Sequence, residues 1–353
     1  MSESFRAASN HADAAATYKR TGAQPRLLMR PLFLLLHVLL SLASCASPAS
    51  SDTLRPLSPD RLLSYTYAND LFFRTDYYFT QGMTLTLVHP ALAHLPTRHL
   101  LAAGPAGSAQ HHGLTLRYDG FTPLRIQDPF IRLGDRPYAA YLYASFFRVG
   151  SQPMRHRRLT TALELGFIGP AAGGKELQTS IHRVTGNAEP RGWDFQIRNA
   201  PIVGYRVAFE QQLAATSHAE LLGSAEASLG TLYTYAGTGI RLRAGQFAPY
   251  FANPGVASPE CPNAPRHWQL YGQAALETRL VGYDATLQGG IFTANDPYTL
   301  ASGDVRRAVL RSSGGVVLAH SGLRFEANAT WISPEFTGGR SHRWGMLGVT
   351  AAF

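Results

Sequence analysis

The sequence predicts an all-β protein, a 12-stranded antiparallel transmembrane β-barrel of the bacterial outer membrane. Three observations support this fold class: apolar and polar residues alternate at period two, an export signal occupies the N-terminus, and the last strand ends on an aromatic residue. No apolar stretch reaches 18 residues, so no membrane-spanning helix is expected. Because only 16% of the residues are charged, long apolar surfaces remain for contact with lipid.

The alternation is clearest in residues 159–167, 268–280 and 323–331, each of which separates into an apolar and a polar face. Both Glu and Arg recur on the polar faces. A soluble barrel would hide its apolar face inside, whereas an outer-membrane barrel keeps charges in its lumen and turns apolar residues toward lipid. The C-terminal row of Leu347, Val349, Ala351 and Phe353 continues this pattern and ends the chain on an aromatic residue.

An apolar run, PLFLLLHVLLSLA at residues 31–43, has the length of a signal-peptide core and is too short to span a bilayer. Residues 1–46 are therefore expected to be a signal peptide, with Met29 as an alternative start. Simple cleavage after Ala46 is the favoured interpretation, and lipidation at Cys45 is the alternative. Cys261 would then be the one cysteine of the exported protein, which excludes an intramolecular disulfide.

A short periplasmic segment, 47–63, and a single barrel domain, 64–353, would follow. The expected strands are residues 64–71, 78–88, 112–119, 138–149, 157–168, 201–213, 219–232, 234–245, 267–281, 305–317, 321–332 and 343–353. An even number of strands places both termini in the periplasm. Most long loops, including 169–200, then lie outside the cell, and residues 286–290 are interpreted as loop, with a short extra strand as the alternative.

Four stretches carry polar residues at what should be one mouth of the barrel. They contain Asp70, Thr80, Arg136 and, in the long loop, His182. The period-two pattern places Asp70 and Thr80 on the lumen face, while Asn69 nominally points outward. Each residue also has an ordinary interpretation: a surface histidine, a lumen salt network of Asp70 and Arg136, and a strand-filling threonine.

These side chains suit hydrolysis of an ester. A histidine can take a proton from water near neutral pH, and the developing oxyanion needs positive charge or fixed donors. Carboxylate and amide oxygens favour calcium over zinc. The sequence offers no HExxH motif, no Cys/His cluster and no GxSxG motif. The net charge of +9 suits anionic surfaces, and the absence of a basic run interleaved with aromatics argues against nucleic acid.

The stretches YAND (67–70), TDYYFTQG (75–82), DRPYAAYLY (135–143) and GFIGPAAGGKELQTSIHRVTGNAEPRGWD (166–194) together resemble the lipid A 3′-O-deacylase family of outer-membrane enzymes. The resemblance implies a 12-stranded barrel that uses calcium and a histidine-activated water to remove the 3′-linked acyloxyacyl chain of lipid A. It implies lipid A or lipopolysaccharide in the outer leaflet as the partner. The outer membrane and, during biogenesis, the barrel assembly machinery are the other expected partners.

The resemblance also assigns roles to individual residues. His182 matches the general base, Asn69 and Asp70 match the pair at the metal and oxyanion region, and Thr80 matches the site threonine. Glu189 matches the carboxylate that supports the histidine, with Ala188 as the rival alignment.

Substrate binding is less well matched. Arg136 matches by motif, and Arg125 with Arg132 approximates the basic pair expected to contact the phosphate of lipid A. Thr179 stands where the family often has Asn, and Ala171 where an acid is common. Two other functions compete: a non-enzymatic pore or structural barrel, and an esterase or phospholipase that acts on another lipid.

Overall fold

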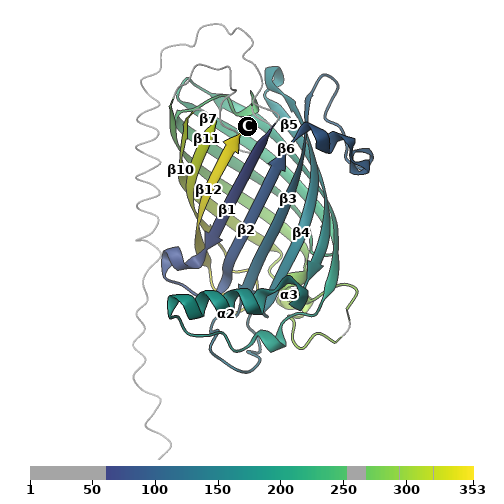
Figure 1. Ribbon diagram of the computed structural model, residues 1–353, viewed down its shortest axis with the longest axis vertical. Coiled ribbons are helices and arrows are strands. Elements are labelled where there is room, and N and C mark those ends of the chain that lie inside the picture. Colours follow the sequence, from purple (N-terminus) through teal and green to yellow (C-terminus); the bar gives the residue numbers. More distant parts are fainter. Residues whose placement is uncertain (1–60, 253–267, 294, 321) are drawn as a thin grey trace, which may run out of the picture.

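The computed structural model describes residues 61–252, 268–293, 295–320 and 322–353. These form a closed antiparallel barrel in which β1 pairs with both β2 and β12 (Figure 1). The strands are β1 Leu62–Asn69, β2 Tyr78–Val88, β3 Ala109–Thr122, β4 Ala139–Gln152, β5 Arg157–Ile168, β6 Ala200–Ala215, β7 Ala219–Gly230, β8 Tyr233–Gln246, β9 Gln269–Asp284, β10 Ala308–His320, β11 Leu323–Ile332 and β12 His342–Ala352. The expected signal peptide, most of segment 47–63 and Cys261 lie outside the described residues.

The fold class expected from the sequence is confirmed, and the differences lie at strand ends. β3 starts at Ala109 and ends at Thr122, three residues beyond the expected strand at each end. Residues 286–290 are not a strand, because Ala285–Gln288 form the short helix α3. None of the described helices is long and apolar enough to cross a membrane.

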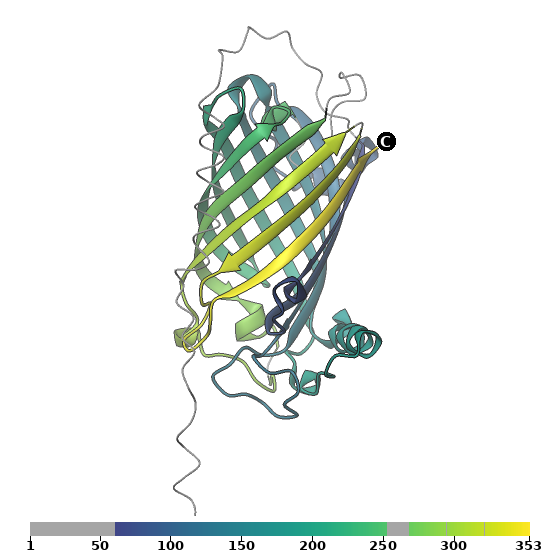
Figure 2. The same cartoon turned by 90° about the vertical axis from the view of Figure 1, so that its left-hand side faces the viewer.

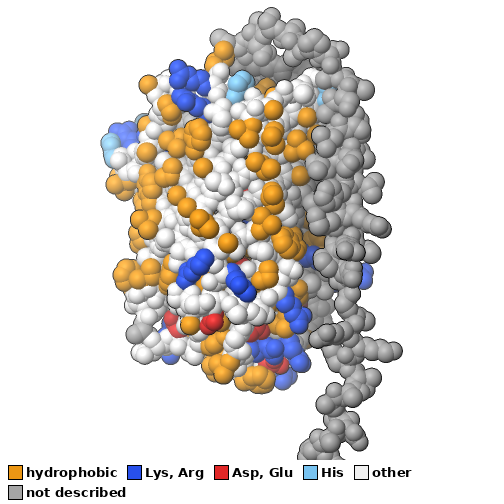
Figure 3. All heavy atoms as spheres, turned by 180° about the vertical axis from the view of Figure 1, so that it is seen from behind, with side chains coloured by type: hydrophobic (Ala, Val, Ile, Leu, Met, Phe, Trp, Pro, Cys, Tyr) orange, Lys and Arg blue, Asp and Glu red, His pale blue; other side chains and the backbone are white. Residues whose placement is uncertain are grey.

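The two faces of the wall differ as the alternation requires. Leucines on the outer face are well exposed, for example Leu347 at 51% and Leu280 at 67%, and apolar side chains cover the wall in Figure 3. The inner face encloses a cavity of about 420 Å³ lined by arginines, carboxylates and tyrosines. A wall that is apolar outside and charged inside is suited to lipid around it and water within it.

The end of the lumen near the C-terminus is filled by side chains. Leu62, Val88, Phe147 and Val149 form a buried apolar layer there. The turn Tyr250–Ala252 (η7) lies against this end, where the main-chain oxygen of Tyr250 accepts a hydrogen bond from the fully buried Arg158. The barrel interior is therefore packed at this end.

The opposite end carries the longest connection, between β5 and β6, which contains helix α2, Gly174–Thr185. The expected loop 169–200 is thus partly helical. Gly173 and Gly186, which flank the helix, both have positive φ, a conformation that glycine adopts without strain. Figures 1 and 2 show α2 outside the barrel, lying across the wall at the ends of β2, β3 and β4.

Candidate active site

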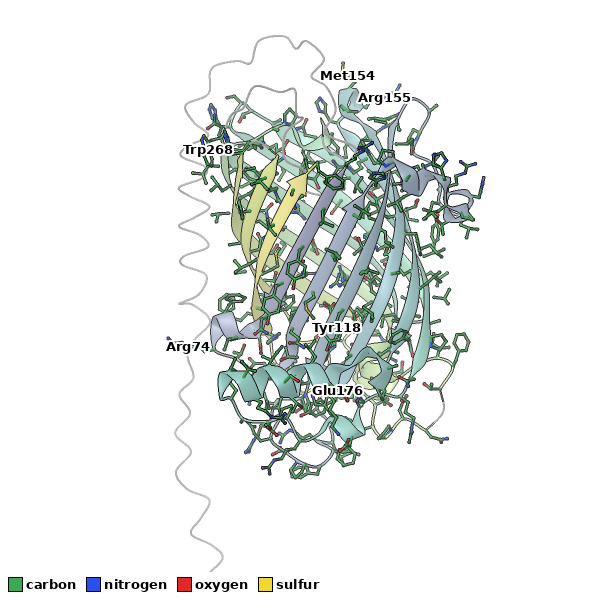
Figure 4. The ribbon with its side chains drawn as sticks, in the orientation of Figure 1. Arg74, Tyr118, Met154, Arg155, Glu176 and Trp268 are labelled. Atoms are coloured by element: carbon green, nitrogen blue, oxygen red, sulfur yellow. The ribbon has the colours of Figure 1, made fainter. Side chains whose placement is uncertain are left out.

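Helix α2 is fastened to the outer wall by one face. Its buried residues Gly174, Gln178 and His182 are spaced four apart and therefore share a side of the helix. A Cβ atom on Gly174 would lie 2.6 Å from both the Ala140 Cβ of β4 and the Trp193 ring, so the helix approaches the wall as closely as glycine permits. Figure 4 shows Tyr118 on the wall beside the helix and Glu176 on the helix itself.

Gln178 connects the helix to the loop that follows it and to strand β2 by one hydrogen bond each. The Trp193 Nε1–H donates to Gln178 Oε1 at 2.7 Å, and Gln178 Nε2 donates to Thr80 Oγ1 of β2 at 3.3 Å. All three side chains are at least 96% buried. Because a buried amide without partners is costly, this chain of bonds sets the depth at which α2 lies on the wall.

His182, one turn further along, is 6% exposed and has two distinct ring nitrogens. Nδ1 lies 2.7 Å from the main-chain oxygen of Ala188, a geometry in which Nδ1 carries the proton and donates it to that carbonyl. Nε2 then has a free lone pair and faces Asp76, whose Oδ2 is 3.9 Å away. A histidine fixed in this tautomer is ready to take a proton at Nε2.

Asn69 and Asp70 lie at the turn η1, Asp70–Phe73, which follows β1. Asn69 Oδ1 accepts a hydrogen bond from the Leu71 N–H at 2.7 Å, which caps the turn. Asp70 Oδ2 accepts from the Tyr77 N–H at 3.0 Å, and the Asp70 main-chain oxygen accepts from the Thr75 side chain. These bonds tie residues 69–77 into one unit, so Asp70 has left the period-two pattern that placed it in the lumen.

Two carboxylates, those of Asp70 and Asp76, belong to this unit. Burial and, to a smaller extent, the negative charge of Asp76 raise the pKa of Asp70 to about 8. Burial also raises the pKa of Asp76, while the nearby His182 lowers it. Taking charged carboxylates out of water is unfavourable, and a bound cation would offset that cost.

Thr80 lies on the outer face of β2, and the expectation that it points into the lumen is wrong. The pairing of β2 with β3 shifts register between Phe79 and Gln81, which marks a β-bulge. Phe79 and Gly82 line the lumen cavity, whereas Thr80 contacts Gln178 of the external helix. A bulge inserts one extra residue and reverses the alternation that follows it.

Glu189 is exposed and paired with Arg183 at 3.3 Å, and it is not the partner of His182 in this structure. The carbonyl of Ala188, the rival position, takes that place. The loop 186–190 therefore supports the histidine through its backbone.

The three arginines expected near the substrate are placed differently. Arg136 has a fully buried side chain that binds Glu335 at 2.7 Å and Thr286 at 2.6 Å, so a lipid outside the wall has no access to it. Arg132 is held between two aspartates, Asp128 and Asp135. Arg125 is largely exposed, with its nearest carboxylate oxygen 3.9 Å away.

The sequence reasoning missed Asp76 and Gln178. Asp76 lies within the TDYYFTQG stretch (75–82). Because it is in a loop, no periodic pattern in the sequence indicates the direction of its side chain. Gln178 had an available signal, because Gly174, Gln178 and His182 recur every four residues between two glycines, a pattern of an amphipathic helix.

The residues at η1 fit a hard divalent cation in part. Asp70, Asp76 and Asn69 supply only oxygen donors, which calcium prefers, and the raised pKa values of both aspartates mark a place that favours positive charge. Among the described residues, no group of three or more His, Cys, Asp or Glu side chains has metal-ligating geometry. Water or substrate oxygens would have to complete such a site.

A closed 12-stranded antiparallel barrel with an apolar outer wall and a charged lumen defines a bacterial outer-membrane protein. The family model described as outer membrane protein LpxR matches residues 32–353. The chain therefore belongs to the LpxR family and is a protein of the outer membrane. This is the family that the four sequence stretches resemble.

Solved structures agree on the fold. LpxR from Salmonella typhimurium has a TM-score of 0.65 at 19% sequence identity, over 83% of this chain and 100% of that chain. The beta domain of the Bordetella autotransporter Brka reaches 0.42 at 11% identity, over 84% and 100% of the two chains. The translocator domain of NalP from Neisseria meningitidis reaches 0.39 at 11%, over 93% and 98%. The last two likenesses carry no argument about this chain, and no curated protein matches it.

Proposed function

We propose that this protein is a lipid A 3′-O-deacylase, a carboxylic ester hydrolase that removes the 3′-linked acyloxyacyl chain. The observation that carries the proposal is His182, held on the lipid side of the wall with Nε2 free and facing Asp76. Membership of the LpxR family supports the substrate class. A site on the outer surface of a barrel is accessible to a lipid that remains in its leaflet.

The proposed reaction begins with a water molecule bound at His182 Nε2. The ring takes one proton from this water as its oxygen attacks the ester carbonyl, and the proton then passes to the leaving alkoxide as the C–O bond breaks. The carbonyl of Ala188 holds Nδ1–H throughout, and so fixes the ring and stabilises its protonated form. Asp76, on the Nε2 side, is placed to orient the water.

Asp70, Asp76 and Asn69 would hold the calcium ion. When bound, calcium would supply positive charge for the oxyanion that develops on the ester carbonyl. Thr80 and Gln178 do not touch the reacting atoms in this proposal. They position α2, and with it His182, against the wall.

We further propose that the α2 end of the barrel faces the outer leaflet. The chain enters and leaves the barrel at the other end, where Leu62 of β1 pairs with Ala352 of β12 (Figure 1). Termini of outer-membrane barrels lie in the periplasm, and longer loops lie outside. This orientation brings His182 to the leaflet that contains lipid A.

The test is a mass spectrum of lipid A from cells that express the wild-type protein or His182→Asn. The wild type should produce lipid A lighter by one acyloxyacyl group, and the variant should not, because loss of a general base costs roughly 10²–10⁴-fold. A heat-modifiable band on electrophoresis verifies that both barrels are folded. Unchanged lipid A with a folded wild-type barrel would refute the proposal.

Two other functions have distinct outcomes in the same cells. Lysophospholipid in place of altered lipid A would indicate an esterase for phospholipids. Steady conductance in planar bilayers would indicate a pore, which the packed layer of Leu62, Val88, Phe147 and Val149 disfavours.

A further inference from the structure

The turn η1 forms a corner on the outer wall beside the candidate active site. Phe72 covers Gly345 of β12, where a Cβ atom would lie 2.7 Å from the Phe72 ring. Phe73 lies under the guanidinium of Arg343, 5.2 Å from ring centroid to Cζ. Because Asp70 belongs to the same turn, the corner is fixed in position relative to the proposed cation ligands.

Two cations project from this corner. Arg343 lies on the lipid-facing row of β12 that continues through Leu347 and Val349, since His342 and Trp344 line the lumen. Arg74 is exposed and directly follows Phe73 (Figure 4). Neither arginine has a carboxylate within 4.0 Å in the parts of the chain that the structure describes. Arg132 and Arg136, by contrast, are neutralised by aspartate and glutamate.

Apolar side chains accompany these cations. Leu71 is 61% exposed and Phe72 is 50% exposed, although both lie at the level where the strands end. Apolar side chains next to arginines at the end of a lipid-facing row are typical of the boundary between acyl chains and charged head groups. The corner therefore matches a ligand that has fatty chains and an anionic group close together.

The backbone of Arg74 gives independent support. Its φ of 56° places it in the left-handed region, at the end of η1. Glycine occupies such positions without strain, whereas other residues persist there only when the surroundings enforce it, often at functional sites. An arginine here puts a charged side chain on the corner where glycine would be the easier choice.

We propose that Arg74 and Arg343 bind a phosphate group of the glycolipid substrate, while Leu71 and Phe72 lie among its acyl chains. This inference rests on the proposed function and adds a second point of attachment to it. With the phosphate held at the corner and the reacting ester at His182, the fixed separation between the two places selects which ester is cleaved. Arg125 and Arg132 are not needed for this contact.

The experiment measures binding without turnover, in the full chain carrying His182→Asn. The probes are hexa-acylated lipid A with both phosphates and the same lipid with its phosphates removed, each in neutral detergent micelles. Arg74→Gly and Arg343→Gln are compared with Arg155→Gln, an exposed arginine at the opposite end of the barrel (Figure 4). Arg74→Gly should fold at least as well as its parent, because glycine relieves the positive φ.

Each corner variant should bind the phosphorylated lipid roughly tenfold more weakly, since it loses a charge-assisted hydrogen bond. Binding of the phosphate-free lipid should not change, and Arg155→Gln should match its parent with both lipids. Equal loss with both lipids, no loss with either, or full competition by phosphatidylglycerol micelles would each overturn the proposal. If phosphate-dependent binding persists while the wild type cleaves nothing, the deacylase function fails and the binding site stands.

Discussion

Adding one methyl group at Gly174 should displace helix α2, and with it His182, from its place on the barrel wall. The new Cβ of Gly174→Ala would lie 2.6 Å from Ala140 Cβ and from the Trp193 ring. Carbon atoms pack at about 3.5–4.0 Å, so helix α2 has to move by about 1 Å. Neither neighbour yields easily, because Ala140 belongs to strand β4 and Trp193 is 99% buried.

His182 is two turns along the same face of the helix and should move with it. A displacement of this size can lower the rate of a positioned reaction by about 10²-fold. The helix itself should not be weakened, because alanine is a better helix former than glycine. The expected result is therefore a fall in kcat with an intact barrel.

The assay is deacylation of lipid A in mixed micelles, together with trypsin cleavage at Lys175 and Arg183, which are exposed on α2. Gly303→Ala is the matched control, since a Cβ there meets no atom within 4 Å. Faster cleavage of α2 should accompany the loss of activity in the Gly174 variant alone. Full activity of Gly174→Ala would show that contact between helix and wall does not position the histidine.

Four further predictions concern charge and assembly. Because the pKa of Asp70 is raised to about 8 and calcium needs the ionised carboxylate, the calcium dissociation constant should rise about tenfold per pH unit from pH 8 to 6; a flat calorimetric titration series would contradict this. Without calcium, the raised pKa of Asp70 should make the free energy of unfolding fall as the pH rises from about 4 to about 8. Arg136→Ala should lower the free energy of unfolding by about 3–5 kcal/mol, because Glu335 and Thr286 lose their buried partner. The KM for lipid A should not change. A raised KM at normal stability would mean that Arg136 does bind the substrate. The Phe353 N–H donates a hydrogen bond to the Arg61 carbonyl where β1 and β12 close the barrel. Deleting Phe353 should reduce the amount of protein in the outer membrane in a fractionation assay, whereas His182→Asn should not. Equal folded levels of both variants would mean that Phe353 does not help to close the barrel.

The sequence was sufficient for the barrel because each strand records its environment locally. Successive side chains of a strand face lipid and lumen in turn, so rows such as Leu347, Val349 and Ala351 identify both the strand and its outer face. The family resemblance also came from contiguous stretches. Strand ends were less certain, since hydrogen bonds at a rim depend on the loops that meet there, as at Thr122 of β3.

The candidate site required the tertiary structure. The bulge at Thr80 turns that side chain outward, and no alternation in the sequence marks the extra residue. The partner of His182 is a main-chain carbonyl, which every residue carries, so the residue types could not distinguish Ala188 from Glu189.

Alternation along the chain was enough to identify the barrel and its lipid-facing rows. It also indicated His182, Asn69, Asp70 and Thr80 as polar residues at one mouth of the barrel. The three-dimensional structure was needed to show that Thr80 lies outside the barrel under helix α2 and that Asp76 lies near His182. This division arises because alternation indicates the face of a strand residue through its nearest neighbours in the chain. The position of a loop side chain depends on contacts with distant strands, which the local pattern does not contain.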